Sequence, residues 1–261
     1  MLRGSAAVAI GTVVYTSLGV VTRVSTFVLV HGASHGGWCW FSVKSLLEDF
    51  GHVVFCPDLP SHGIDRTPLE AVTLPAYANA IHKVLDHVRG PVILVGHSLG
   101  GAVISEVASQ SPSRVEKLIY VSGLLLGPGQ TVHEIVANDT EALLLSAFDI
   151  NEDATVATPI PDVAANVFYH DCSAESIALA TTLLVPHAIA PNAYPASPLP
   201  EGMPRAYVEC TLDRTITLRT QREMHAAVGC DRVVTLESGH SPFFSMPTGL
   251  ASHLHALSSK L

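Results

Sequence analysis

Short runs of apolar, β-branched residues recur at six places along the chain. They lie at 26–31, 52–56, 91–95, 117–121, 205–210 and 232–236. The apolar residues in these runs are largely consecutive instead of alternating with polar ones. Such runs are typical of strands that are covered on both faces, as in a parallel sheet.

Between these runs lie segments with the periodicity of amphipathic helices, at 38–50, 74–88, 100–110 and 218–228. Each of them ends beside a residue that terminates helices: Gly51, Gly90, Pro112 or Gly229. Strand and helix therefore alternate, which predicts an α/β fold with a mostly parallel, doubly wound sheet. Ligands of such folds bind at the carboxyl ends of the strands.

The alternation stops between about residues 124 and 200, where helical segments and proline-rich connections occur without a run that fits a core strand. We expect this block to form a helical lid over the strand ends. The predicted division of the chain is an N-terminal extension over 1–24, the first part of the core over 25–123, the lid over 124–200 and the second part of the core over 201–261.

The N-terminal residues are open to more than one interpretation. Residues 4–22 carry no charge and follow Arg3, as in a weak signal peptide or signal anchor. They also contain glycines and β-branched residues without a cleavage-site pattern, so an additional strand or a dispensable extension is an equal alternative. We expect no stable membrane insertion and a cytoplasmic protein, with secretion left open.

The charge pattern narrows the choice of partners. The net charge is −9 with only 14% charged residues, and no basic cluster occurs, so we expect neither nucleic acid nor an anionic membrane surface as a partner. Residues 118–204 contain no lysine or arginine but ten acidic residues. A lid without cations cannot pair with a phosphate or carboxylate. If these acids only solvate exposed helix faces, the pattern still disfavours an anionic ligand.

Cysteine and histidine usage gives no indication of a metal or another cofactor. The five cysteines are odd in number and form no CxxC pair, which favours free thiols over disulfides or a zinc site. The best metal candidates among the fourteen histidines, His31 and His35, lie in a glycine-rich segment and not on one helix face. A homodimer is compatible with the sequence but is not specified by it.

The segment from Gly96 to Gly100 reads Gly-His-Ser-Leu-Gly, a GxSxG motif between a predicted strand and a predicted helix. The flanking glycines allow a turn sharp enough to lift Ser98 above the sheet, and the helix directs its first N–H groups toward developing negative charge. We interpret Ser98 as a nucleophile. The alternative is a serine that only caps the helix.

A serine nucleophile needs a base, and the base needs a group that orients it. When the nucleophile follows a strand in this way, the acid and then the histidine come later in the chain. Asp213 follows the strand at 205–210, and His240 follows the strand at 232–236. Three other residues fit less well. Asp231 precedes its strand and so lies at the wrong end of the sheet, and Glu237 fits a loop carboxylate better. His97 points away from its neighbour Ser98 and is interpreted as a supporting residue.

The same chemistry requires two N–H donors that bind the oxyanion. Leu99 follows the nucleophile and supplies the first. The loop after the first core strand supplies the second, which we assign to Ala33, with Gly32 permitting close approach of the backbone. The alternative interpretation of this loop is a plain glycine-rich turn.

Four stretches, at 27–63, 92–101, 169–186 and 237–247, resemble one branch of the α/β-hydrolase superfamily. This branch contains plant methylesterases, hydroxynitrile lyases and bacterial esterases that act on pyrethroid-like esters. The resemblance runs from about residue 27 to the C-terminus and implies the α/β-hydrolase fold, Ser98, Asp213 and His240 as the catalytic triad, Ala33 and Leu99 as the oxyanion donors, and no cofactor.

Two positions favour an esterase over a lyase within this branch. The lyases carry threonine where this chain has Gly32 and lysine where it has Ser241. A neutral serine cannot balance the departing cyanide anion. The predicted activity is therefore hydrolysis of small, neutral, hydrophobic carboxylic esters, with a cyanohydrin lyase and a low-turnover ligand receptor as the alternatives.

The plant members place a tryptophan over the substrate, but Trp38 and Trp40 of this chain both lie in its first helix. We expect residues of the lid, together with Gly32 and Ser241, to line the pocket. These lid residues are Phe148, Phe168, Tyr169, Leu183 and residues 143–145. Packing inside the lid is an equal alternative for these lid residues.

Overall fold

The computed structural model describes residues 13–15 and 21–259 of the chain. Strands β1 (Val13–Tyr15) and β2 (Val21–Arg23) pair antiparallel with each other. Most of the predicted extension over 1–24 lies outside the described residues, and with it the question of a signal peptide. Within the described part of the chain, no helix combines the length and the apolar character needed to cross a membrane.

The centre of the molecule is a sheet of six parallel strands in the order β11-β10-β6-β5-β3-β4. Their bounds are β3 (Thr26–Val30), β4 (Val53–Phe55), β5 (Val92–His97), β6 (Val115–Val121), β10 (Arg205–Cys210) and β11 (Arg232–Leu236). Every residue of β5 is buried, because helices cover both faces of the sheet. This arrangement confirms the fold class expected from the consecutive apolar runs.

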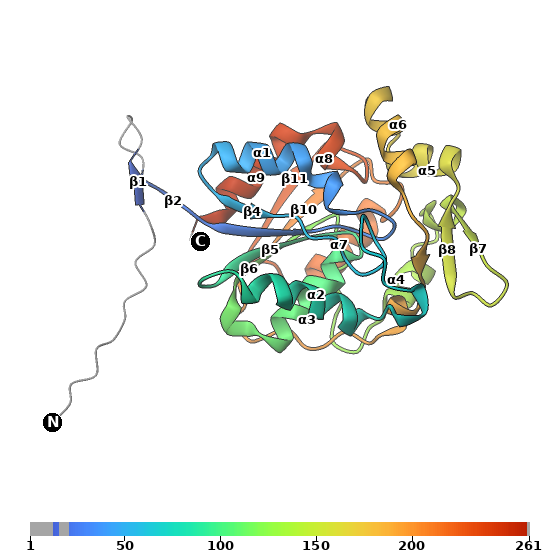
Figure 1. The fold of residues 1–261 in the computed structure, drawn as a ribbon, viewed down its shortest axis with the longest axis horizontal. Coiled ribbons are helices and arrows are strands. Elements are labelled where there is room, and N and C mark those ends of the chain that lie inside the picture. The colour runs from blue at the N-terminus through green and yellow to red at the C-terminus, as the bar shows by residue number, and fades with distance from the viewer. Residues whose placement is uncertain (1–12, 16–20, 260–261) are drawn as a thin grey trace.

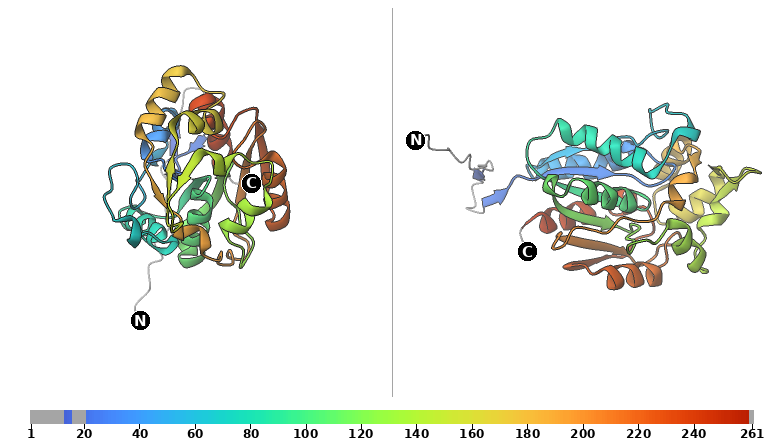
Figure 2. Two further views of the ribbon diagram at one scale, coloured as in Figure 1. Left: turned by 90° about the vertical axis from the view of Figure 1, so that its right-hand side faces the viewer. Right: turned by 90° about the horizontal axis from the view of Figure 1, so that it is seen from below.

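Helices α1 (Phe41–Asp49), α8 (Pro242–Ser245) and α9 (Pro247–Ser258) cover one face of the sheet, and α2 (Leu74–Asp86), α3 (Gly100–Gln110) and α7 (Leu218–Val228) cover the other (Figures 1 and 2). Each layer encloses its own apolar core against the sheet. The predicted helix over 38–50 is divided into a 3-10 turn, η1 (Gly37–Trp40), followed by α1. Two further 3-10 turns, η2 (Leu69–Ala71) and η3 (Pro112–Arg114), lie in the connections.

The segment between β6 and β10 lies at the carboxyl ends of the strands, at the right of Figure 1. It contains helices α4 (Val132–Asn138), α5 (Pro161–Phe168) and α6 (Ala174–Leu183) and the turns η4 (Leu144–Ala147) and η5 (Ala190–Ala193). It also contains an antiparallel sheet of β7 (Phe148–Ile150), β8 (Val156–Pro159) and β9 (His187–Ala188). The sequence pattern predicts helices in this segment, but it misses this small sheet.

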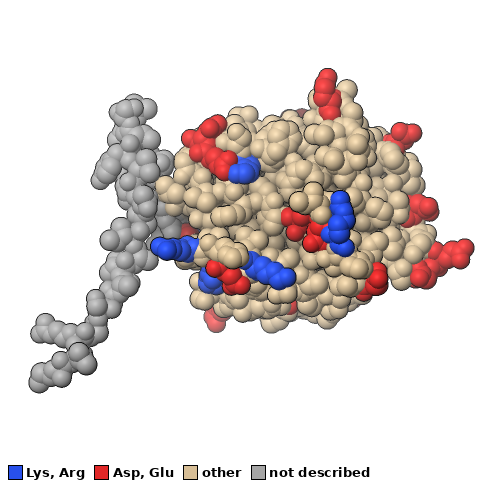
Figure 3. Space-filling model, in the orientation of Figure 1, with Lys and Arg blue, Asp and Glu red and all other residues tan. Residues whose placement is uncertain are grey.

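At this end of the molecule, the charged side chains visible in the space-filling view are acidic (Figure 3). This agrees with the absence of lysine and arginine from residues 118–204. The segment over the strand ends therefore supplies no lysine or arginine of its own to an anionic ligand. Two cations that reach it, Arg214 and Arg219, come from the core and bond to Asn166 and to the carbonyl oxygen of Asn138.

Candidate active site

Ser98 lies in the sharp turn between β5 and α3. Its backbone has φ = 51°, in the left-handed region that non-glycine residues rarely adopt. A Cβ atom on Gly96 would press into the carbonyl group of Gly100, and a Cβ atom on Gly100 would lie 2.5 Å from the carbonyl oxygen of Val30. Both glycines are thus required by the close packing of the turn against α3 and β3.

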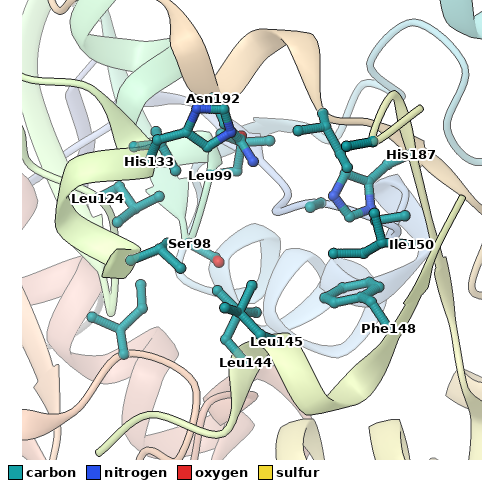
Figure 4. A pocket seen from close by; sticks show the side chains of 17 residues that line it. Ser98, Leu99, Leu124, His133, Leu144, Leu145, Phe148, Ile150, His187 and Asn192 are labelled. Atoms are coloured by element: carbon teal, nitrogen blue, oxygen red, sulfur yellow. The ribbon is translucent and has the colours of Figure 1, made fainter. Parts of the chain in front are cut away.

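The side chain of Ser98 does not cap the helix, because the N-cap residue of α3 is Leu99 and no side chain bonds to this terminus. In the described part of the chain the Ser98 hydroxyl makes no hydrogen bond, and Figure 4 shows its oxygen directed into a cavity. The turn therefore presents a hydroxyl group to whatever occupies that cavity.

Asp213 and His240 lie together in the loops after β10 and β11. The Nδ1 atom of His240 is 2.8 Å from Oδ2 of Asp213. The two side chains are 3% and 0% exposed respectively, so the interaction is shielded from water. The structure thus brings together two residues that are 27 positions apart in the sequence.

The carboxylate of Asp213 is held by several further donors. Its Oδ1 accepts the backbone N–H groups of Thr215, at 2.6 Å, and of Ile216, at 3.1 Å. Its Oδ2 accepts the hydroxyl of Ser122 and an N–H of Gln221. These contacts fix the plane of the carboxylate relative to the imidazole.

The predicted site omits Ser122 and Gln221. Ser122 directly follows β6, so its position at the same edge of the sheet was a usable signal. Gln221 lies inside α7, and nothing in the sequence distinguishes it from other helical glutamines.

His97 connects the loop of His240 to the turn of Ser98. The Nε2–H of His97 donates to the carbonyl oxygen of His240 at 2.8 Å, and the two imidazole rings have centroids 4.6 Å apart. Burial lowers the pKa of His97 well below its usual value, so its ring is neutral. This placement agrees with the interpretation of His97 as a supporting residue.

A carboxylate from the cover over the strand ends also holds the loop of His240. Oδ2 of Asp171, in the segment between α5 and α6, accepts the backbone N–H of Gly239 at 2.6 Å. A Cβ atom on Gly239 would lie 2.6 Å from Oδ1 of the same carboxylate. In the sequence Asp171 is only one of the ten acids of residues 118–204, because it reaches this loop only in the folded chain.

Ala33 and Leu99 line the same cavity as Ser98. Among the described residues, no acceptor receives the backbone N–H of either residue. A Cβ atom on Gly32 would lie 2.8 Å from Cβ of Ser98, so glycine lets the loop approach the serine closely. This is the arrangement that a pair of oxyanion donors requires.

The cavity above Ser98 has a volume of about 300 Å³. Most of its wall is apolar, and the apolar side chains include Leu124, Phe148 and Ile150 (Figure 4). None of the residues that line it is Asp, Glu, Lys or Arg. Besides Ser98, the polar residues of the wall are His133, His187 and Asn192. The cavity is suited to an uncharged, mainly hydrophobic ligand.

The predicted substrate contacts divide into three groups: residues on the cavity wall, exposed residues and buried residues away from the wall. Phe148 lines the cavity, as do Leu144 and Leu145. Leu143 and Leu183 are not on its wall, and both are part of the exposed surface of the cover.

The other predicted contacts are buried and are not on the cavity wall. Phe168 packs between Phe148 and His240. The hydroxyl of Tyr169 meets Nε2 of His35 at 2.7 Å. Ser241 is completely buried, and Gly32 contributes only backbone beside Ser98. An apolar pattern identifies buried positions but does not tell which of them face a cavity.

The two histidines considered as metal ligands have their ring nitrogens engaged in hydrogen bonds. His31 bonds the carbonyl oxygen of Gly32 and the backbone N–H of Leu59. His35 bonds the carbonyl oxygen of Ala33 and the hydroxyl of Tyr169. The described residues contain no group of three or more side chains arranged to hold a metal ion.

Comparison with known sequences supports the resemblance. The model of the alpha/beta hydrolase family matches residues 27–253. Methylesterase 18 of Arabidopsis thaliana is 32% identical over 257 residues, which cover 90% of this chain and 97% of that protein. A pyrethroid hydrolase of Sphingobium wenxiniae is 33% identical over 241 residues, covering 87% of this chain and 85% of that protein.

Solved structures give the same result. The crystal structure of a pyrethroid hydrolase from Sphingobium faniae superposes with a TM-score of 0.82 at 30% identity. The superposition covers 90% of this chain and 97% of that one. The branch indicated by the four sequence stretches is therefore confirmed, and the similarity includes the segment over the strand ends.

Proposed function

Because the chain belongs to the α/β hydrolase family, we propose that it is a serine carboxylesterase that hydrolyses neutral, hydrophobic carboxylic esters. The observation that carries the proposal is the buried pair of Asp213 and His240 beside the turn that presents Ser98 to an uncharged cavity. The curated relatives named as methylesterases and as a pyrethroid hydrolase support the same reaction class.

The proposed mechanism begins with Ser98. Nε2 of His240 removes the hydroxyl proton, and the oxygen attacks the ester carbonyl carbon. The N–H groups of Ala33 and Leu99 bind the resulting oxyanion. His240 then donates the proton to the departing alcohol, which leaves an acyl group on Ser98.

Water completes the reaction by the same steps. His240 removes a proton from the water molecule, the hydroxyl group attacks the acyl carbonyl, and the acid leaves as the proton returns to Ser98. Throughout, Asp213 accepts the Nδ1–H of His240 and stabilises the positive charge that forms on the ring. The hydrogen bonds from Ser122 and Gln221 keep its carboxylate in place.

The surroundings of positions 32 and 241 support an esterase over a cyanohydrin lyase. A threonine at position 32 would place its Cβ 2.8 Å from Cβ of Ser98 and 3.1 Å from Nδ1 of His97. A lysine at position 241 would replace a side chain that is completely buried and makes no hydrogen bond. Burying an ammonium group there costs several kcal/mol, on the order of the penalty for an unpaired buried ion.

Two measurements test the proposal. Ser98→Ala should lower kcat for p-nitrophenyl hexanoate by about 10⁶, whereas Ser113→Ala, at an exposed serine beyond α3, should leave it unchanged. Retention of more than a hundredth of the activity in Ser98→Ala would exclude Ser98 as the nucleophile. The mono-p-nitrophenyl ester of adipic acid has an acyl chain like that of the hexanoate but ends in a carboxylate. Its kcat/KM should be lower than that of p-nitrophenyl hexanoate by about 100-fold or more. Equal values would remove the argument from the uncharged cavity.

A further inference from the structure

His187 is a polar residue in a mainly apolar cavity wall. It lies in β9 and faces the cavity across from Ser98 (Figure 4). Only 4% of its surface is exposed, and its ring packs edge-to-face on Phe148 with centroids 5.0 Å apart. The proposed ester chemistry assigns it no task.

A hydrogen bond fixes the orientation of this ring. Nδ1 of His187 is 2.8 Å from Oγ of Ser34, the residue that follows the proposed oxyanion donor Ala33. The carbonyl oxygen of Ser34 also accepts the backbone N–H of Val185 at 3.0 Å. The backbone of Ser34 has φ = 63°. The two hydrogen bonds tie β9 and the residues directly before it to the loop of Ala33.

The ring is neutral under ordinary conditions. Burial, with smaller contributions from the nearby His62 and His35, lowers the pKa of His187 to about 3. A neutral imidazole has one N–H group and one lone pair. If the hydroxyl of Ser34 donates to Nδ1, the ring proton lies on Nε2, and Nε2 makes no hydrogen bond to any described residue.

We propose that His187 determines substrate specificity by donating its Nε2–H to a second acceptor of the substrate, an ether or carbonyl oxygen outside the ester group that is cleaved. This inference rests on the proposed esterase function and defines its substrate class more narrowly. In that reaction the carbonyl oxygen of the ester is bound by Ala33 and Leu99, and the alkoxy oxygen receives its proton from His240. A simple alkyl ester therefore leaves the Nε2–H group without a partner, which weakens its binding.

The test uses two esters of equal length and shape. p-Nitrophenyl 4-methoxybutanoate and p-nitrophenyl 3-ethoxypropanoate each replace one CH₂ group of p-nitrophenyl hexanoate by oxygen, at different distances from the carbonyl. The measured quantity is the ratio of kcat/KM for each ether ester to that for hexanoate, after correction for their rates of hydrolysis by hydroxide. The wild type should prefer at least one ether ester.

Three substitutions separate specificity from packing. His187→Leu removes both nitrogens and should lower the preferred ratio by about 5- to 10-fold. His187→Asn retains a polar amide group near the position of Nδ1, so it keeps the hydrogen bond to Ser34. Because it has no N–H near the position of Nε2, it should lower the ratio as His187→Leu does. His187→Gln retains an N–H near the position of Nε2 and should restore most of the ratio.

An unchanged ratio in His187→Asn or in His187→Leu would overturn the proposal, and so would a full restoration by asparagine together with none by glutamine. The hexanoate rate identifies which proposal has failed. If turnover that depends on Ser98 persists but the ratio does not respond, only the role of His187 is wrong. If the wild type shows no such turnover, the esterase proposal itself fails.

Discussion

Replacement of Asp213 by asparagine preserves the size of the side chain but changes which proton His240 carries. Oδ1 of Asp213 accepts the N–H groups of Thr215 and Ile216, so the asparagine oxygen should remain there. The amide NH₂ then takes the position of Oδ2, 2.8 Å from Nδ1 of His240. Because Nδ1 now faces a donor, it must act as an acceptor, and the ring proton moves to Nε2.

A ring with its proton on Nε2 cannot accept the proton of Ser98. The variant also lacks the negative charge that stabilises the imidazolium, and its NH₂ group opposes the N–H of Gln221, which lies 3.4 Å from Oδ2 in the native site. Water cannot compensate, because the side chains of Asp213 and His240 are buried. The same change in a serine protease triad lowers kcat by about 10⁴, or about 5 kcal/mol, and we expect a loss of that order here.

The assay is release of p-nitrophenol from p-nitrophenyl hexanoate by Asp213→Asn, with thermal unfolding as the test of folding. Asp231→Asn is a matched control. Oδ2 of Asp231 accepts the backbone N–H of Arg205 at 2.8 Å, at the opposite end of the sheet, so its kcat should be close to that of the wild type. A folded Asp213→Asn variant with more than a tenth of the native kcat would refute the reasoning.

Three further predictions follow from other contacts. Gly96→Ala should lower the midpoint of thermal unfolding and nearly abolish ester turnover, because the new Cβ meets the carbonyl of Gly100; a stable, active variant would contradict this. Asp171→Ala should lower kcat by about 10- to 100-fold with little change in KM, since the loop at Gly239 loses its acceptor, whereas Asp171→Asn should retain most activity; equal kcat values for the two variants would exclude this positioning role. Burial lowers the pKa of His35 to about 4. The imidazole ring of His35 therefore binds a proton more tightly in the unfolded chain than in the folded one, and the free energy of unfolding should fall by about 3 kcal/mol as the pH is lowered from 6.5 to 4. Urea unfolding should show a smaller fall for His35→Gln, and an equal fall would contradict the assignment.

The sequence was sufficient to predict the central sheet, because burial on both faces leaves a local pattern. The apolar run at 205–210 coincides with β10, which is buried at all but its first residue. The run at 232–236 coincides with β11, which lies at the edge of the sheet and is buried only at Leu236. The helix predicted over 100–110 coincides with α3. Asp213 and His240 could be predicted as a pair for the same reason, since the ends of parallel strands share one edge of the sheet.

Features that depend on contacts between distant segments could not be predicted in this way. Strands β7 and β8 are short and partly exposed, and β9 is buried but only two residues long, so none of the three leaves an apolar run in the sequence. Phe148 and Phe168 are equally apolar, but one faces the cavity and the other is packed beside it. Asp171 and Gly239 are 68 positions apart in the sequence, so their contact depends on the folded path of the chain between them.

The bond between Asp171 and Gly239 also limits how the protein can be recombined. A chimera that receives residues 124–200 from a relative would replace the acceptor while keeping the loop that donates to it. If the donor segment has no carboxylate at the equivalent place, the loop of His240 loses an acceptor even though Ser98, Asp213 and His240 are all retained. Exchange of substrate preference between such relatives would therefore require the two segments to be transferred together.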